Sequence, residues 1–182
     1  APKVRAPLSY RLPEGESFED HAMACARELE ARILAEGPET VLAFIMEPIG
    51  GLSSGAVVAP ASYYQEVRRI CTRHGVLLIH DEIMSGAGRS GAFLSSAHWP
   101  GATPDIVTLA KGLAAGYTPF GAVLASDAMV RAVAVHGGFV HGHTYFSNPF
   151  SCAVARAVVE VVRDERLTER AAETGAYLAE RL

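Results

Sequence analysis

The sequence predicts an α/β fold, a sandwich of helices around a mostly parallel sheet. Two observations support it: short, continuous apolar runs recur along the chain, and segments with apolar residues at helical spacing separate them. Strands that alternate with helices in this way form βαβ units, whose strands are parallel. The 182 residues, 49% of them hydrophobic and 20% charged, are enough for one domain with its own core.

The first half of the chain is expected to contain an extended lead-in and four regular elements. Residues 1–16 carry three prolines, which disfavour a helix there. Ser17 can cap a helix, and Gly37-Pro38 ends the helical spacing of apolar residues at about Glu36. The expected elements are therefore a helix over 17–36, a strand over 41–46 buried on both faces, a helix over 61–74 closed by Gly75, and a strand over 76–79.

The second half repeats the alternation. Apolar runs predict two further strands, and Asn148 followed by Pro149 is a typical helix start. The expected elements are strands over 106–110 and 120–125 and helices over about 127–135, 149–164 and 167–182.

Composition excludes several classes of function. The net charge is −4 and basic residues form no stripe, so we expect no nucleic-acid partner. No apolar run approaches the ~20 residues of a membrane span, and no signal peptide is apparent, so we expect no membrane association. Cys25, Cys71 and Cys152 are widely spaced, which fits neither a disulfide framework nor a zinc site and favours a reducing, cytoplasmic setting.

Lys111 is the residue most suggestive of chemistry. Only two of the 16 basic residues are lysines, and Lys111 directly follows the apolar run 106–110. Unlike arginine, a desolvated lysine can lose its proton and attack a carbonyl carbon. The alternative is a lysine at a strand end whose ammonium group reaches solvent.

Three strand ends carry unusual polar residues, namely Glu47, Asp81 and Lys111. In open α/β sheets such ends face the ligand crevice. Asp81 alone is equally a cap or loop anchor. As a pair, the two residues have a clearer role: Asp81 could keep a pyridine nitrogen protonated while Lys111 binds an aldehyde. A pyridoxal phosphate enzyme needs this pairing.

Other motifs are weaker. Residues 86–91 satisfy G-x-G-x-x-G, but six residues separate the first glycine from the preceding strand and no helix opens on the glycines, so we expect a tight loop instead of a dinucleotide site. His136, His141 and His143 cluster in the sequence. The His141-x-His143 pair could supply two metal ligands, but no pattern for a further ligand accompanies it, so no metal is expected. Residues 142–149 are either a connecting loop capped by Asn148 or an anion site that uses the Thr144 hydroxyl.

Four ordered blocks resemble class III (omega-type) aminotransferases, which are fold type I pyridoxal phosphate enzymes. Residues 78–91 resemble the family's D-E-V-x-T-G-F-G-R-T-G block, and residues 104–112 its P-D-x-x-x-x-x-K-G block. Residues 141–149 resemble the H-G-x-T…N-P block, and Glu47-Pro48 the E-P pair. The resemblance covers about residues 40–165, and the preceding stretch also reads like these enzymes. It implies a three-layer α/β/α sandwich.

The resemblance also implies roles for single residues. Asp81 is expected to pair with the pyridine nitrogen, Ile83 to pack on one face of the ring, and Lys111 to form the Schiff base and move a proton. Thr144, with the backbone near His143, is expected to bind the cofactor phosphate of the other subunit, because these enzymes are homodimers with shared active sites.

Glu47 is expected on the substrate side of the site. The implied reaction transfers an amino group from an amine or omega-amino acid to a keto acid such as pyruvate. An aminomutase or decarboxylase of the same fold, or a non-catalytic homologue, would use the same residues or retain them unused.

One departure and two missing parts bear on these expectations. Ala87 stands where the family usually has phenylalanine, which implies a looser loop or a wider pocket. The family's phosphate cup and its small C-terminal domain have no counterpart here. We therefore expect residues 1–182 to be the central portion of the large cofactor-binding domain, inactive alone.

Overall fold

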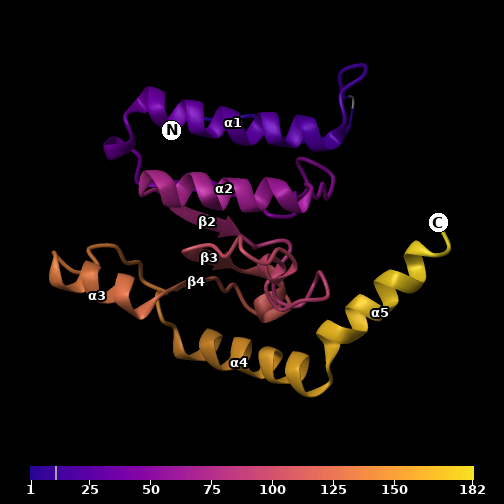
Figure 1. Cartoon of the computed structure of the whole chain (residues 1–182). Coiled ribbons are helices and arrows are strands. Elements are labelled where there is room, and N and C mark those ends of the chain that lie inside the picture. Colours follow the sequence, from indigo (N-terminus) through magenta and orange to yellow (C-terminus); the bar gives the residue numbers. More distant parts are fainter. Residues whose placement is uncertain (11) are drawn as a thin grey trace. The chain divides into compact units, whose positions relative to one another are not determined.

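The computed structural model describes residues 1–10 and 12–182, which fall into two compact units (Figure 1). The first comprises Ala1–Asp81 and Ser96–Pro104, and the second Glu82–Ser95 and Asp105–Leu182. Residues 1–10 and 12–16 contain no helix or strand, as predicted, and position 11 of that lead-in lies outside the described residues.

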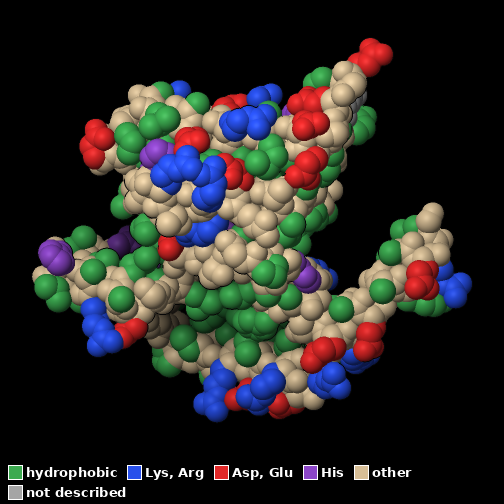
Figure 2. Space-filling model, in the orientation of Figure 1, with side chains coloured by type: hydrophobic (Ala, Val, Ile, Leu, Met, Phe, Trp, Pro, Cys, Tyr) green, Lys and Arg blue, Asp and Glu red, His purple; other side chains and the backbone are tan. Residues whose placement is uncertain are grey.

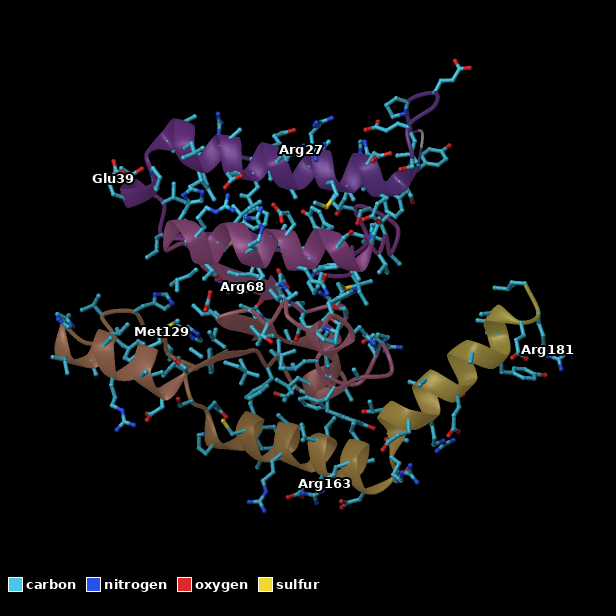
Figure 3. All side chains as sticks on the ribbon, in the orientation of Figure 1. Arg27, Glu39, Arg68, Met129, Arg163 and Arg181 are labelled. Atoms are coloured by element: carbon cyan, nitrogen blue, oxygen red, sulfur yellow. The ribbon has the colours of Figure 1, made fainter. Side chains whose placement is uncertain are left out.

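The first unit consists of two helices packed on a parallel pair of strands. Helix α1 (Phe18–Glu36) packs along α2 (Ala61–His74), and their side chains fill the space between them (Figure 3). Strand β1 (Ala43–Met46) pairs in parallel with β2 (Leu77–Asp81). These four elements confirm the predicted helix–strand alternation, and the single turn η1 (Pro38–Thr40) connects α1 to β1.

The helix ends are those that the sequence predicts. The Ser17 hydroxyl accepts a hydrogen bond from the Asp20 main-chain N–H at 3.1 Å, which satisfies one of the free donors at the start of α1. Gly75 ends α2 in the left-handed conformation, with φ of 68°, and its N–H donates to carbonyl oxygens of the last helical turn.

The core of the first unit lies between the helices and one face of the strands. Fifteen residues are buried in this cluster: Ala22, Cys25, Ala26, Leu29, Ile33, Ala59, Tyr63, Tyr64, Val67, Ile70, Cys71, Val76, Leu78, Trp99 and Ala102. Full burial of a large apolar side chain contributes about 1.5–3 kcal/mol, so this cluster is a sufficient core for the unit. Because Phe44 and Met46 also pack on it, this face of β1 is the covered one.

The prediction that the strand over 41–46 is buried on both faces is wrong. Ile45 points to the face opposite Phe44 and is 58% exposed, and Leu42 is 78% exposed. Apolar residues occupy both faces of β1, but α1 and α2 cover only one of these faces.

The second unit contains β3 (Ile106–Leu109), β4 (Ala122–Ala125) and three helices, α3 (Asp127–Val135), α4 (Pro149–Asp164) and α5 (Leu167–Ala179). All five were predicted. The single turn η3 (Lys111–Ala114) also belongs to this unit, whereas η2 (Ser95–His98) begins at its residue Ser95 and continues in the first unit. Strand β4 runs antiparallel to β3, unlike most of the predicted sheet, because the connection between them holds only the turn η3 and no crossover helix.

Helix α4 supplies the main cover of the second unit's core. Val107, Leu109 and Leu113 are buried there, and Val159 of α4 packs against them. Charged side chains occupy the outer side of α4, where Figure 2 shows them gathered and Figure 3 labels Arg163. The predicted start of α4 is confirmed, since Asn148 Oδ1 accepts a hydrogen bond from the Ser151 N–H at 3.1 Å and Pro149 occupies the first turn.

Within residues 1–10 and 12–182, every helix is too short or too polar to cross a membrane.

Candidate active-site residues

Two carboxylates follow the parallel strands of the first unit at the same edge. Met46 lies opposite His80 in the β1–β2 register, so Glu47 and Asp81 come next on neighbouring strands. Side chains alternate along a strand, and Asp81 therefore shares the face of Ile79, opposite to Leu78 and the helices. The structure thus brings these two predicted residues to one edge and one face of β1 and β2.

The two carboxylates differ in environment. Asp81 is half-buried at the end of β2. Glu47 is exposed, and its Oε2 accepts a hydrogen bond from the Gly51 main-chain N–H at 2.5 Å. Glu47 therefore anchors the loop that follows β1, in addition to any contact with a substrate.

Lys111 stands just beyond β3 in the second unit, with its side chain exposed. Its φ is 44°, a left-handed conformation that costs a residue other than glycine on the order of 1 kcal/mol or more. The turn is held by its neighbours, because Leu113 is buried in the core and the Thr118 hydroxyl lies 2.9 Å from that of Ser151 in α4. The lysine is thus placed at the strand end by the packing around it.

The segment after Asp81 is organised by a buried carboxylate that the sequence analysis overlooked. Glu82 is fully buried, and its Oε2 accepts a hydrogen bond from the Ser95 N–H at 2.6 Å. Its own N–H donates to the carbonyl oxygen of Thr108, in β3, at 2.9 Å. A second acidic residue directly after Asp81, followed by Ile83 and Met84, is the signal that could have identified it. Ile83 follows, half-buried.

The glycines of the G-x-G-x-x-G segment are explained by close packing. A Cβ on Gly86 would lie 2.5 Å from Leu109 Cδ2 and 2.8 Å from the Glu82 carbonyl oxygen. A Cβ on Gly91 would lie 2.9 Å from Ala172 Cβ in α5, and Gly91 also has a φ of 84°. The segment is therefore a tight loop packed on β3 and α5, and no helix begins at it.

This loop also reaches the lysine turn. A Cβ added to Gly112 would lie 3.5 Å from Ala87 Cβ and 3.9 Å from the Gly86 carbonyl oxygen. The loop that starts at Ile83 is therefore in contact with the residue next to Lys111. Ala87, where the family usually carries phenylalanine, has a φ of 55° and is half-buried.

His143 and Thr144 lie in the turn that precedes α4, and both are exposed. The ring of His143 is 6.4 Å from that of His141 and 6.0 Å from that of Phe146. Across the described ranges 1–10 and 12–182, no group of three or more His, Cys, Asp or Glu side chains is arranged to hold a metal ion. Cys25, Cys71 and Cys152 are free thiols and lie in α1, α2 and α4.

Known proteins resemble the chain over nearly its whole length. The family model of class III aminotransferases matches residues 2–182. The diaminobutyrate–2-oxoglutarate transaminase of Halomonas elongata is 41% identical over 98% of this chain and 39% of its own length. The putrescine–pyruvate aminotransferase of Pseudomonas aeruginosa is 38% identical, over 98% of this chain and 39% of its own.

Solved structures agree with the predicted α/β fold. A pyridoxal phosphate-bound amine transaminase from an uncultivated Pseudomonas species has a TM-score of 0.89 at 42% identity, covering 98% of this chain and 41% of that one. An (S)-enantioselective omega-transaminase from Thermomicrobium roseum has a TM-score of 0.88 at 41% identity, covering 96% and 39%. The chain therefore spans about two fifths of the length of these relatives. Identity at this level indicates common ancestry as well as a shared fold. The chain belongs to the class III aminotransferase family.

Proposed function

We propose that this chain is the central portion of the large, cofactor-binding domain of a longer pyridoxal phosphate-dependent aminotransferase. The protein would transfer an amino group from an amine or omega-amino acid to a keto acid such as pyruvate. The observation that carries the proposal is the family match over residues 2–182, in a chain that retains Asp81 at the end of β2 and Lys111 just beyond β3. The position of both residues after strands is typical of ligand-binding groups in α/β sheets.

The chemistry of these residues fits pyridoxal phosphate. Asp81 offers a half-buried carboxylate for a protonated ring nitrogen, and Ile83 offers apolar surface for the ring. Lys111 offers an exposed amine for the aldehyde, held on a strained turn. When bound, the cofactor supplies an aldehyde that condenses with amines and a cationic ring that accepts an electron pair.

The protein groups would then hold and move protons. Asp81 would keep the proton on the ring nitrogen, because its negative charge stabilises the cationic form of a neighbouring group. The Lys111 amine would remove the proton from the substrate carbon that carries the amino group and would hold it for return, acting first as a general base and then as a general acid.

Thr144 and His143 would contribute to the cofactor site of a second subunit. Both are exposed in the turn before α4, within a segment rich in exposed apolar residues: Val135, Phe139, Val140, Tyr145, Phe146 and Phe150. Exposed apolar surface of this kind is typical of a protein interface. We propose that it belongs to a homodimer interface, and that the Thr144 hydroxyl and the backbone near His143 bind the phosphate of the partner's cofactor.

The dimer can be tested apart from the chemistry. Val140 is 97% exposed, so Val140→Asp should leave the subunit folded but place a charge in the interface. Sedimentation velocity of the full-length protein should then show a larger fraction of monomer. An unchanged dimer in the variant would remove residues 135–150 from the interface.

The experiment that tests the function is borohydride reduction of the full-length protein followed by peptide mass spectrometry. We expect a pyridoxyl phosphate adduct on the peptide that contains Lys111 and none on the peptide that contains Lys3. Amine consumption that depends on added pyruvate would identify transamination. Consumption without pyruvate would instead indicate a decarboxylase or an aminomutase, and the absence of any adduct would indicate a non-catalytic homologue.

A further inference from the structure

The loop after β1 is folded back on itself at the same edge as Asp81. Ile49 and Val58 form an isolated antiparallel bridge, and the Gly50 N–H donates to the Val57 carbonyl oxygen at 2.9 Å. The Glu47 carboxylate accepts the Gly51 N–H at the start of the loop. Residues 48–59 thus form a compact loop whose ends lie close together.

One buried side chain joins the two ends of this loop. The Tyr64 hydroxyl donates to the Pro48 carbonyl oxygen at 2.6 Å and accepts from the Ala59 N–H at 3.0 Å. Tyr64 is 1% exposed, and its ring stacks on Trp99 with centroids 3.8 Å apart. Burial raises the pKa of Tyr64 to about 12, so the hydroxyl stays protonated and can donate across the physiological range.

The contact at Pro48 bears directly on Glu47. Proline has a fixed φ, and the residue before it is restricted to extended conformations. A hydrogen bond that holds the Pro48 carbonyl therefore also limits the direction in which Glu47 leaves β1. Pro48 is itself almost fully buried, which removes the remaining freedom of this peptide.

We infer that Tyr64 is a positioning residue, whose hydroxyl closes the loop 48–59 and so aims Glu47 at the substrate. The inference rests on the proposed function and on the expectation, implied by the family resemblance, that Glu47 lies on the substrate side of the site. Tyr64 lies on α2 and is buried, so its effect on a substrate would pass through Glu47.

The neighbouring Tyr63 is a matched control. It lies on the same helix, is 3% exposed, and also contributes its ring to the core. In the described part of the chain, no hydrogen bond of its hydroxyl to another residue is found. Tyr63→Phe and Tyr64→Phe therefore remove the same atom from the same helix, and only the second opens the loop.

The first measurement is amide hydrogen exchange of the full-length protein, which does not depend on activity. Tyr64→Phe should speed exchange at Ala59 and Gly51 by about three- to ten-fold, the loss expected for one or two hydrogen bonds, and Tyr63→Phe should not. Unchanged exchange in Tyr64→Phe would overturn the inference, whether or not the protein proves to be an aminotransferase.

The second measurement is two-substrate kinetics with pyruvate as acceptor. Tyr64→Phe should raise the KM for pyruvate by about three- to ten-fold with kcat little changed, because it disturbs binding more than the chemical step. In a Glu47→Gln background the same change should add little, since both substitutions would act through the Glu47 carboxylate. Additive effects, or an equal rise in Tyr63→Phe, would overturn the role of Tyr64 in aiming Glu47.

If the wild-type protein forms no Lys111 adduct and does not use pyruvate, the proposed function fails. The exchange experiment then still decides whether Tyr64 closes the loop.

Discussion

The two units of the chain bury their apolar residues very differently. In the first unit, α1 and α2 each contribute five buried residues to a continuous core. In the second, α4 contributes one buried residue, Ala155, while α3 and α5 have no buried residue among those described. Yet α3 and α4 are amphipathic and carry well-formed caps, so their sequences are those of helices that pack.

The difference indicates where the remaining stability of the protein comes from. The apolar residues of α1 and α2 are buried within the first unit, whereas the second unit leaves apolar side chains such as Val140 and Phe150 exposed. Exposed apolar surface of this kind is typical of interaction sites, which is the basis of the homodimer interface proposed above. The second unit also carries Lys111, whereas Asp81, the other residue proposed to act on the cofactor, belongs to the first unit.

The largest effect is expected at Lys111. Lys111→Ala should lower transamination by the full-length protein on the order of 10⁴-fold or more, because the group that exchanges with the substrate is lost. The side chain is exposed, so the free energy of unfolding should stay within about 0.5 kcal/mol. Lys3→Ala, at the other lysine of the chain, is the control for activity.

Initial rates and urea unfolding of both variants decide this prediction. Residual turnover of Lys111→Ala near the wild-type rate would contradict it. A large loss of stability instead would mean that Lys111 supports the strained turn more than the chemistry.

Asp81→Asn tests the matching position in the first unit. It replaces a carboxylate by a neutral group of the same shape, so a cation held beside it would lose its partner. Losing one member of such a pair costs about 3–5 kcal/mol, which corresponds to a rate loss on the order of 10²–10⁴-fold. Stopped-flow rates of the amine half-reaction measure this step directly. Near-normal rates would show that another group keeps the ring nitrogen protonated.

Core truncations compare the two units directly. Ile70 is fully buried in α2, whereas Val135 at the end of α3 is 80% exposed. Ile70→Ala should destabilise the protein by about 2–5 kcal/mol, and Val135→Ala by less than about 0.5 kcal/mol. Urea unfolding followed by circular dichroism gives both values. A cost for Val135→Ala close to that of Ile70→Ala would show that α3 is buried in the complete protein.

Local sequence signals predicted most of this structure. Ser17, Gly75 and the Asn148-Pro149 pair determine helix ends through bonds to residues within one turn, so they can be identified without tertiary information. The positions of Asp81 and Lys111 at strand ends could be predicted as well, because the apolar runs before them are also local signals. Their roles in catalysis remain predictions.

What the sequence could not predict depends on residues far apart in the chain. The exposure of Ile45 depends on which face the helices cover, and the burial of Glu82 on Ser95 reaching its carboxylate. Gly91 is required because Ala172, about eighty positions later, packs against it. The direction of β4 likewise depends on a connection too short for a crossover helix.

The smallest effect, and the sharpest test of the comparison between the units, comes from two serine N-caps whose main-chain hydrogen bonds are nearly equal in length, although the Ser17 hydroxyl also donates to the Asp20 carboxylate at 2.6 Å. Ser17 accepts the Asp20 N–H at 3.1 Å in α1, and Ser126 accepts the Met129 N–H at 3.2 Å in α3. Removing such a cap costs its helix about 1 kcal/mol. Because α1 is part of a cooperative core, Ser17→Ala should lower the global free energy of unfolding by that amount.

Ser126→Ala should behave differently, since α3 buries no described residue and can open on its own. We expect faster amide exchange confined to residues 127–135 with an unchanged urea midpoint. A shifted midpoint equal to that of Ser17→Ala would instead mean that α3 unfolds together with the rest of the protein. That result would place a covering surface over α3 and would identify the second unit's sparse core as half of a larger one.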